Sequence, residues 1–430
     1  MCDEDNEKPF WFSTREGLAQ PKPDWGPAIW LRLQRHTPPG ASYDRVIRPP
    51  VLLLHGGSAN HRTFTISEIG LADWLFALGL DPWLLDWRGS SLVADCPRNR
   101  MTLETKSEFY TFNRAAQEDV PAAIAIMRSQ GVKGPIAAVG HCMGAAVIAE
   151  TVALDWTKGA IDRIVLLTLG LFYEAPIDSR LKSEERILER LTRAVRNVPF
   201  IDPRLNEDGT LRNPWPADLN RLYDAWPSGL RAHEQKPAAG VDGMCNRVSF
   251  MYGMPFRHDN LDTSIHENAS VQQDGVIGEP ELAKYFGGFP LQMYLHAARN
   301  LRAGQATSFD SNGPEIVTEL ARQRFHNLER LTLITGQLNR LWHRDSIDRM
   351  HEWLCRGSSQ TSLVARKHVL KNYAHQDLLW SKRSPLDVYP LIAEGLGLLI
   401  VADHPSRTRA ATPVQAFAHL TDPESSASAR

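Results

Sequence analysis

The sequence predicts an α/β protein in which helices cover both faces of a mostly parallel central sheet. Short apolar runs bounded by turn residues alternate with segments whose apolar residues recur at helical spacing, which is typical of parallel strands joined by crossover helices. One long stretch lacks this alternation, and we expect it to form a large, mainly helical insertion rather than a loop. The 430 residues can form one large domain of this kind, since a single core supports that length.

The expected elements follow from local composition and spacing. Strands are expected where Val, Ile and Leu cluster, at 29–33, 51–54, 82–85, 136–139, 164–167, 331–334 and 367–370. Helices are expected at 71–78, 112–128, 144–154, 347–354 and 386–396. In the second of these helices Val120, Ile124 and Met127 recur every three or four residues, which places them on one face.

The alternation divides the chain into regions. We expect residues 1–170 and 325–402 to form the core, 171–324 to form an inserted cap, and 403–430 to form a mobile tail rich in Ser, Thr and Pro. Within the cap, helices are expected at 184–194, 280–286 and 291–301.

Composition excludes several functions. Lys plus Arg is 48 and Asp plus Glu is 50, so the charge balance gives no electrostatic case for binding nucleic acid or an anionic membrane. No apolar run is long enough to span a bilayer, and the acidic start Met1–Asp5 does not resemble a signal peptide. The 5 cysteines are scattered without a CxxC pair, which argues against a disulfide framework and a zinc site. We expect a cytoplasmic protein without metal or cofactor.

Cys142 is the candidate nucleophile. It is the central residue of Gly140-His141-Cys142-Met143-Gly144, between an expected strand and an expected helix. This matches the nucleophile elbow, with cysteine in place of serine, in which small residues two positions away allow a sharp turn. The helix start should lower the pKa of the thiol. A buried structural cysteine between two packing glycines is the alternative.

Backbone N–H groups for an oxyanion hole are expected at two places. The N–H of Met143 follows the nucleophile, and the strand at 51–54 ends in His55-Gly56-Gly57-Ser58. Glycines allow the chain to turn there and direct the N–H of Gly57 or Ser58 at a developing negative charge.

His375 is the candidate general base, because it lies between the last expected strand and the last helix. A third residue should orient its ring and should follow the strand at 331–334. Asn339 stands there, and an amide oxygen can orient an imidazole beside a cysteine nucleophile. Asp345, Asp348 and Glu174 are the alternatives.

The ordered motifs resemble those of the α/β-hydrolase superfamily. Within it the chain is similar to hydrolase domains associated with glucose-methanol-choline (cholesterol-oxidase-type) oxidoreductases, and Asn339 fits that group. The matching stretches are Trp83–Ser90, Gly140–Gly144, Met251–Met254, His258-Asp259, Asn372–Lys382 and Asp387–Pro390. Polyhydroxyalkanoate synthases and dienelactone hydrolases are more distantly similar. The resemblance implies an α/β-hydrolase fold and acyl transfer at a thiol. No GxGxxG motif follows the first strand, so a flavin is not implied.

The substrate is expected to be a small apolar ester, thioester or lactone. Candidate pocket residues are His141, Met251, Tyr252, Phe286 and Tyr294. The aromatic and methionine residues could instead pack the cap, and His141 could simply pack or hydrogen-bond. Asp86 and Arg88 are expected to join loops by charged hydrogen bonds rather than to act in catalysis.

Three functions are consistent with these residues. The first is hydrolysis through an acyl-thioenzyme on Cys142. The second is transfer of the acyl group to an alcohol or amine. The third is non-catalytic binding on a hydrolase scaffold, which the amide at Asn339 in place of an acid would allow. The oligomeric state does not follow from the sequence.

Overall fold

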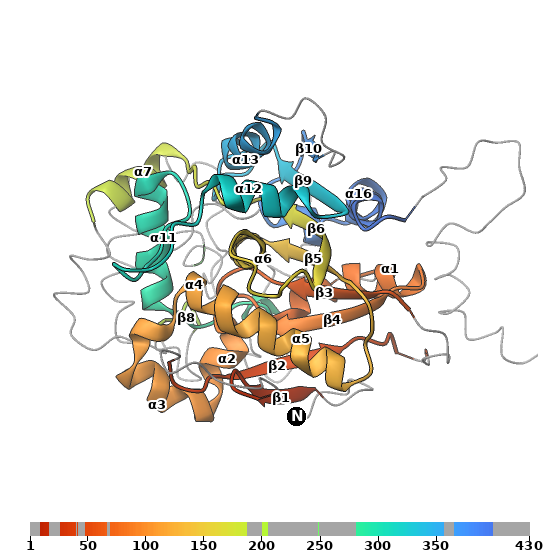
Figure 1. Cartoon of the computed structure of the whole chain (residues 1–430), viewed down its shortest axis with the longest axis horizontal. Coiled ribbons are helices and arrows are strands. Elements are labelled where there is room, and N and C mark those ends of the chain that lie inside the picture. Colours follow the sequence, from red (N-terminus) through yellow and green to blue (C-terminus); the bar gives the residue numbers. More distant parts are fainter. Residues whose placement is uncertain are drawn as a thin grey trace, which may run out of the picture.

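The central sheet lies between two sets of helices (Figure 1). The computed structural model describes residues 9–16, 26–39, 41, 48–66, 69–186, 200–204, 248, 281–356 and 365–398. Over these ranges eight strands form one sheet in the order β1-β2-β4-β3-β5-β6-β9-β10. The first two pairs are antiparallel and the remaining five are parallel. The predicted α/β-hydrolase fold, with its mostly parallel sheet, is therefore confirmed.

The strands lie close to the positions that the sequence predicts. Their bounds are β1 Phe10–Ser13, β2 Trp30–Arg35, β3 Pro50–Leu54, β4 Asp81–Asp86, β5 Ile136–His141, β6 Ile161–Leu167, β9 Arg330–Gly336 and β10 Arg366–Leu370. The strand β1 was not predicted. It is short and lies at the edge of the sheet, where only one neighbour stabilises it.

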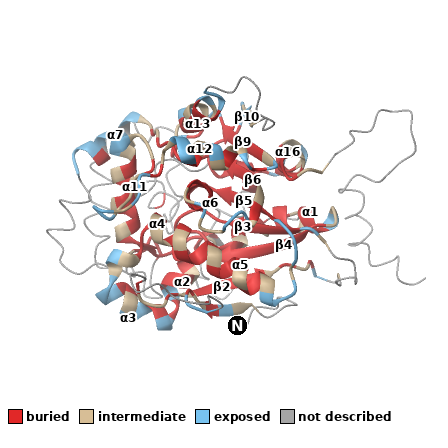
Figure 2. Cartoon of the chain, viewed as in Figure 1, coloured by how far each residue is buried: buried red, intermediate tan, exposed pale blue. Residues whose placement is uncertain are grey.

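The sheet separates two hydrophobic cores (Figure 2). Along β3, Leu52 and Leu54 belong to one core, whereas Val51 and Leu53 belong to the other. Successive strand residues point to opposite faces, so a strand covered on both sides must be apolar throughout. This is why the strands read as continuous apolar runs in the sequence.

Helices cover each face. The core that contains Cys142 also contains residues of α5 Val120–Ser129, α6 Met143–Ala153, α12 Glu319–His326 and α13 Asp345–Cys355. The other core contains residues of α1 Leu71–Ala77, α14 Asp377–Trp380 and α16 Tyr389–Gly395. Further helical segments outside the predicted cap include η1 His61–Phe64, α2 Ser91–Asp95, α3 Pro97–Thr105 and η2 Ser107–Phe109.

Two predicted helices are interrupted. The segment 112–128 begins as α4 Phe112–Arg114, continues as a π-helical turn at Ala115–Asp119 and becomes α5. The predicted helix at 386–396 is divided into α15 Ser384–Asp387 and α16, whose second residue is Pro390. Proline has no N–H to donate to the preceding turn, so it favours a new helix start at this point.

Part of the predicted cap lies within the described residues. Its elements are α7 Ile177–Glu184, β7 Phe200–Ile201, η6 Glu281–Lys284, β8 Phe289–Pro290, α11 Leu291–Ala303 and α12. The helix predicted at 291–301 is confirmed as α11. The helix predicted at 280–286 is only the single 3-10 turn η6, and the one predicted to start at 184 is wrong there because α7 ends at Glu184. Residues 187–194 lie outside the described residues, and the cap's boundaries stay a prediction.

Asp86 and Arg88 join loops, as predicted. The Arg88 guanidinium is completely buried and donates to Asp119 at 2.5 Å and to Glu118 at 2.7 Å. Asp86 accepts from the backbone N–H of His61 at 2.9 Å and from the Ser90 hydroxyl at 2.8 Å. The pKa of the Asp86 carboxyl lies well below its usual value because neighbouring histidines and Arg32 favour the charged form.

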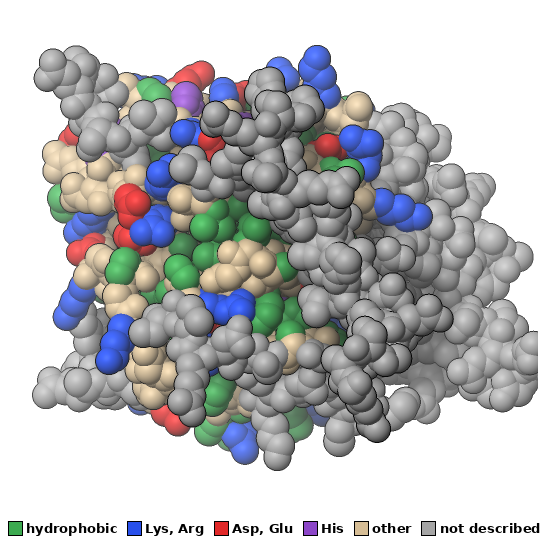
Figure 3. All heavy atoms as spheres, turned by 90° about the vertical axis from the view of Figure 1, so that its right-hand side faces the viewer, with side chains coloured by type: hydrophobic (Ala, Val, Ile, Leu, Met, Phe, Trp, Pro, Cys, Tyr) green, Lys and Arg blue, Asp and Glu red, His purple; other side chains and the backbone are tan. Residues whose placement is uncertain are grey.

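On the face shown in Figure 3, hydrophobic and uncharged side chains separate the Lys and Arg side chains. Within the described ranges, none of the helices combines the length and the apolar character needed to cross a bilayer.

Candidate active site

Cys142 occupies the junction between β5 and α6. Its backbone has φ 56° and ψ −125°, and its N–H donates to the carbonyl of Leu167 at 3.0 Å. The two flanking glycines permit this turn. A Cβ on Gly140 would lie 2.5 Å from Cα of Ala145, and one on Gly144 would lie 2.4 Å from the carbonyl oxygen of His55. Backbone atoms cannot yield by that much, so the strained turn requires glycine at both positions.

The end of β3 lies directly against the cysteine. A Cβ on Gly56 would lie 3.0 Å from Cβ of Cys142, so the two backbones approach closely. The N–H groups of Gly57 and Met143 both face the sulfur and favour its thiolate. The N–H of Ser58 instead donates to the carbonyl of Gly89 at 3.0 Å. Of the two predicted donors on this loop, the backbone N–H of Gly57 is therefore the one that faces the sulfur of Cys142.

The thiol of Cys142 is neutral at rest. Only 6% of the residue is exposed, and burial raises the pKa of the thiol to about 11 even though three N–H groups, from Trp342, Met143 and Gly57, oppose the rise. The N–H of Met143 at the start of the helix does act to lower this pKa, but the expected thiolate is not favoured, because burial outweighs that contribution. Removing the sulfur from water disfavours its charged form by more than the nearby dipoles favour it.

Trp342 is a site residue that the sequence analysis missed. Its indole lies beside the sulfur of Cys142 and, of all the neighbouring groups, opposes the rise of the thiol pKa most. The indole N–H is buried and has no hydrogen-bond partner at normal distance and angle among the described residues. A neutral thiol is a weak acceptor, so this donor becomes effective only when negative charge develops on the sulfur. A lone tryptophan after a strand gives no sequence signal for such a role.

His375 and Asn339 are brought together by the loops after β10 and β9. The Nδ1 of His375 lies 3.2 Å from the Oδ1 of Asn339, so an N–H at Nδ1 donates to the amide oxygen. The same oxygen accepts from the backbone N–H groups of Leu341 and Trp342 at 3.1 and 3.2 Å. These two bonds fix the side chain of Asn339, and through it the orientation of the imidazole.

The alternative acidic residues are engaged elsewhere. Asp348 accepts from Lys367 at 2.6 Å, and Asp345 lies 3.1 Å from the ring of His343. Glu174 pairs with two arginines, Arg180 and Arg349. Among the described residues, the atom that contacts Nδ1 of His375 is the amide oxygen of Asn339.

His141 contacts the candidate base rather than forming a simple pocket wall. Its Nε2 donates to the backbone carbonyl of His375 at 3.0 Å, and the two rings lie 4.8 Å apart. Burial lowers the pKa of His141 to about 4. The pKa of His375 is also held well below 6.5, by burial and by its neighbour His141. Both imidazoles are therefore neutral at pH 7.

The predicted pocket residues have different surroundings. Tyr294 belongs to the core that contains Cys142 and packs edge-on against Phe289 at 4.9 Å. Phe289 packs over the loop His55–Ser58 that follows β3, because a Cβ on Gly57 would lie 2.8 Å from its ring. Phe286 packs against Trp380 in the core on the other face. Met251 and Tyr252 lie outside the described residues, so these pocket assignments stay predictions.

The described residues contain no group of three or more His, Cys, Asp and Glu side chains that could hold a metal ion. The structure places two backbone N–H groups at the buried thiol of Cys142, and holds the ring of His375 against the amide of Asn339.

Comparison with known proteins identifies the family. The model of the alpha/beta hydrolase family matches residues 51–411. Among solved structures, the chain is similar to an esterase from Thermogutta terrifontis, with 12% identity, TM-score 0.41, and coverage of 86% of this chain and 94% of that one. It is also similar to a monoacylglycerol lipase from Paleococcus ferrophilus, with 12% identity, TM-score 0.40, and coverage of 85% and 98%. Comparison with curated proteins gives no match. Because the family model covers most of its length, the chain belongs to the alpha/beta hydrolase family.

Proposed function

We propose that the protein hydrolyses an ester, thioester or lactone through an acyl-thioenzyme on Cys142. The observation that carries the proposal is the sulfur at the strained β5–α6 turn, faced by the N–H groups of Met143 and Gly57. A buried nucleophile with two convergent backbone donors is the arrangement that acyl transfer requires.

The first half-reaction begins from neutral partners. Because burial raises the pKa of the thiol and lowers that of His375, the proton moves from sulfur to imidazole as the sulfur attacks the carbonyl carbon. The N–H groups of Met143 and Gly57 stabilise the tetrahedral oxyanion, each contributing about 10²–10³ in rate. The imidazolium then protonates the leaving oxygen or sulfur, which departs and leaves an acyl group on Cys142.

The second half-reaction uses water. His375 removes a proton from the water as its oxygen attacks the thioester carbonyl, and the same oxyanion donors act again. Collapse breaks the carbon–sulfur bond, and the proton on His375 returns to the sulfur. The acid is released and the resting thiol is restored.

Asn339 acts by positioning rather than by charge. Its Oδ1 accepts the Nδ1–H of His375, which leaves the lone pair of Nε2 available to accept a proton. A neutral amide does not raise the basicity of the ring as a carboxylate would. Cysteine tolerates this better than serine, since a thiol gives up its proton more readily than a hydroxyl.

Mass spectrometry tests the acyl-enzyme directly. The protein is mixed with a panel of nitrophenyl esters, thioesters and lactones, quenched in acid within the first turnovers, weighed intact and then digested into peptides for mass analysis. We expect an added acyl mass on the peptide that contains Cys142, with Cys96 and Cys355 of the same molecule unmodified as internal controls. Turnover in which the Cys142 peptide stays unmodified while another residue carries the acyl group would contradict the proposal.

The pH dependence of kcat/KM should reflect the depressed pKa of His375. Protonation of His375 removes the base, so activity falls as the pH falls, and the midpoint of that decline is expected below pH 6.5. The rate is measured between pH 4 and 8. A decline centred above pH 6.5 would be inconsistent with a buried, neutral His375.

Folding must be monitored in the same series. His141 and His296 have folded-state pKa values of about 4, whereas unfolded histidines take up protons near pH 6.5. The unfolded state therefore binds more protons between these values, and stability declines as the pH falls. Circular dichroism at each pH separates this loss of structure from the titration of the base.

A further inference from the structure

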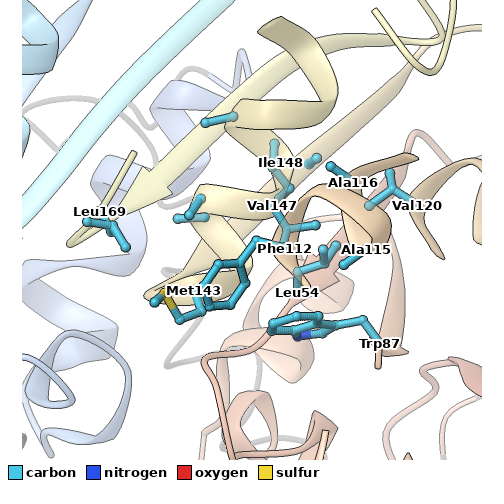
Figure 4. Packing of buried hydrophobic residues seen from close by; sticks show 14 of the residues in the cluster. Leu54, Trp87, Phe112, Ala115, Ala116, Val120, Met143, Val147, Ile148 and Leu169 are labelled. Carbon is cyan, nitrogen blue, oxygen red and sulfur yellow. The ribbon is translucent and has the colours of Figure 1, made fainter. Parts of the chain in front are cut away.

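The sulfur of Cys142 lies in apolar surroundings. Cys142 and Met143 both belong to the hydrophobic core on their side of the sheet, and Figure 4 shows Met143 among buried hydrophobic side chains that include Phe112 and Leu169. Among the described residues, the groups that favour a thiolate here are N–H donors rather than cations. Negative charge on this sulfur therefore depends on the few N–H groups that reach it.

The indole N–H of Trp342 is a buried donor for which the rest of the fold provides no other acceptor. Only 7% of the residue is exposed, and its N–H has no partner at normal distance and angle among the described residues. Buried N–H groups almost always have an acceptor, because leaving one unpaired is costly. The atom beside this N–H is the sulfur of Cys142. The structure thus holds a donor next to the atom that becomes charged when the thiol ionises.

Two contacts fix the position of this indole. Its ring packs edge-on against Tyr173, with 5.3 Å between the ring centres. The backbone N–H of Trp342 donates at 3.2 Å to Oδ1 of Asn339, the same oxygen that lies 3.2 Å from Nδ1 of His375. One amide oxygen therefore positions both the candidate base and the indole beside the sulfur.

We propose that Trp342 is a catalytic residue whose indole N–H donates to the sulfur of Cys142 while that sulfur carries negative charge. The inference rests on the proposed function and adds a donor to it. The N–H groups of Met143 and Gly57 stabilise the oxyanion of the tetrahedral intermediate, in which the sulfur is an uncharged sulfide. The indole acts before that intermediate forms and after it collapses.

Charge develops on the sulfur twice in each turnover. In acylation the thiol proton moves to Nε2 of His375, and an electron pair of the sulfur forms the carbon–sulfur bond. In deacylation that bond breaks, its electron pair returns to the sulfur, and the sulfur takes the proton back from His375. The indole of Trp342 keeps its hydrogen throughout and stabilises the charged sulfur by a charge-assisted hydrogen bond.

Alkylation by iodoacetamide tests the donor without any substrate. The reagent reacts with the thiolate, and the rate is followed at pH 8 from the mass of the peptide that contains Cys142. At this pH the neighbouring Tyr173, His141 and His375 are uncharged. Trp342→Phe removes the N–H and keeps an aromatic ring. We expect it to slow alkylation about tenfold or more, because a hydrogen bond to a charged sulfur is lost.

The sign of the change separates donation from packing. If the indole only filled space, the smaller phenyl ring would admit water and reagent to the sulfur, and alkylation would become faster. Unchanged or faster alkylation would overturn the proposal. Trp353→Phe is the matched control, because Trp353 packs in the same core against Phe172 and Phe325. Its replacement should leave the rate as it is in the unmodified protein.

Nuclear magnetic resonance needs neither a folded Trp342 variant nor access for a reagent. The tryptophans are labelled with ¹⁵N, and the pH is raised from 8 to 10.5, over which part of the Cys142 thiol ionises. One indole N–H signal should move to lower field in the unmodified protein and stay in place in Cys142→Ala. If every indole signal behaves alike in the two proteins, no indole donates to the thiolate and the proposal fails.

Turnover distinguishes this proposal from the proposed function. Trp342→Phe should lower kcat for nitrophenyl esters about tenfold with little change in KM, because the N–H contacts the sulfur rather than the substrate. Hydrolysis that depends on Cys142 but is unaffected by Trp342→Phe would refute the role of the indole alone. Hydrolysis that persists in Cys142→Ala would refute the proposed function, whatever the alkylation rates show about the contact.

Discussion

Replacement of Cys142 by alanine is expected to lower kcat/KM for ester-type substrates by about 10⁴-fold or more. The sulfur is the atom that forms the covalent intermediate, and nothing else at the β5–α6 turn can replace it. The backbone of Cys142 has a positive φ, a conformation that strains alanine and cysteine to a similar extent. We therefore expect the variant to fold like the unmodified protein, and its melting temperature measures this.

Cys96→Ala is the matched control. Cys96 is another buried free cysteine, but it precedes α3 and does not face the oxyanion donors. Its replacement should leave kcat/KM unchanged. If Cys142→Ala retained activity while remaining folded, the thiol would not be the nucleophile. The non-catalytic alternative predicts instead that the unmodified protein turns over none of the substrates.

Arg88→Met is expected to destabilise the protein by about 3–5 kcal/mol. The completely buried guanidinium is bonded to Asp119 and Glu118 and also donates to the carbonyl of Phe109 at 2.6 Å. Methionine fills part of the space but leaves the buried carboxyl of Asp119 without its cation, whereas Glu118 keeps its pair with Arg114 at 3.3 Å. The cost of the uncompensated charge exceeds the lost packing. Urea-induced unfolding at pH 7 measures the change.

Two comparisons identify the cause of this loss. The deficit of Arg88→Met should shrink as the pH falls, because protonation of the uncompensated Asp119 carboxyl removes its buried charge. A deficit that is independent of pH would mean that lost packing dominates. Arg322→Met is the control, since Arg322 pairs with Glu319 at the surface, and its replacement should cause no measurable change.

Much of the backbone framework of the candidate site could be predicted because it depends on neighbouring residues. The glycines on either side of Cys142 and the strand and helix around it act over a few residues, where steric exclusion decides the backbone. The order of the motifs then predicted that His375 and Asn339 lie together, because the carboxyl ends of parallel strands meet at one edge of the sheet. The contact between these two residues is present in the structure.

Other features could not be predicted because they depend on distant residues. The sequence does not decide whether the N–H of Gly57 or that of Ser58 faces the nucleophile. In the structure the N–H of Ser58 donates to the carbonyl of Gly89, which leaves that of Gly57. Trp342 lies at the sulfur because Asn339 fixes the loop between them. Glu150 reads as an ordinary helix residue, yet burial raises the pKa of its carboxyl to about 8.

The amino-acid sequence by itself determined the succession of strands and helices and the bend that presents the sulfur, since short-range sterics and alternating hydrophobicity act within a few residues. Only the packing of layers decided that this sulfur is a neutral thiol with a pKa of about 11 and not a ready thiolate. The protonation state of a side chain depends on how completely water is excluded from it, and residues from opposite ends of the chain do the excluding.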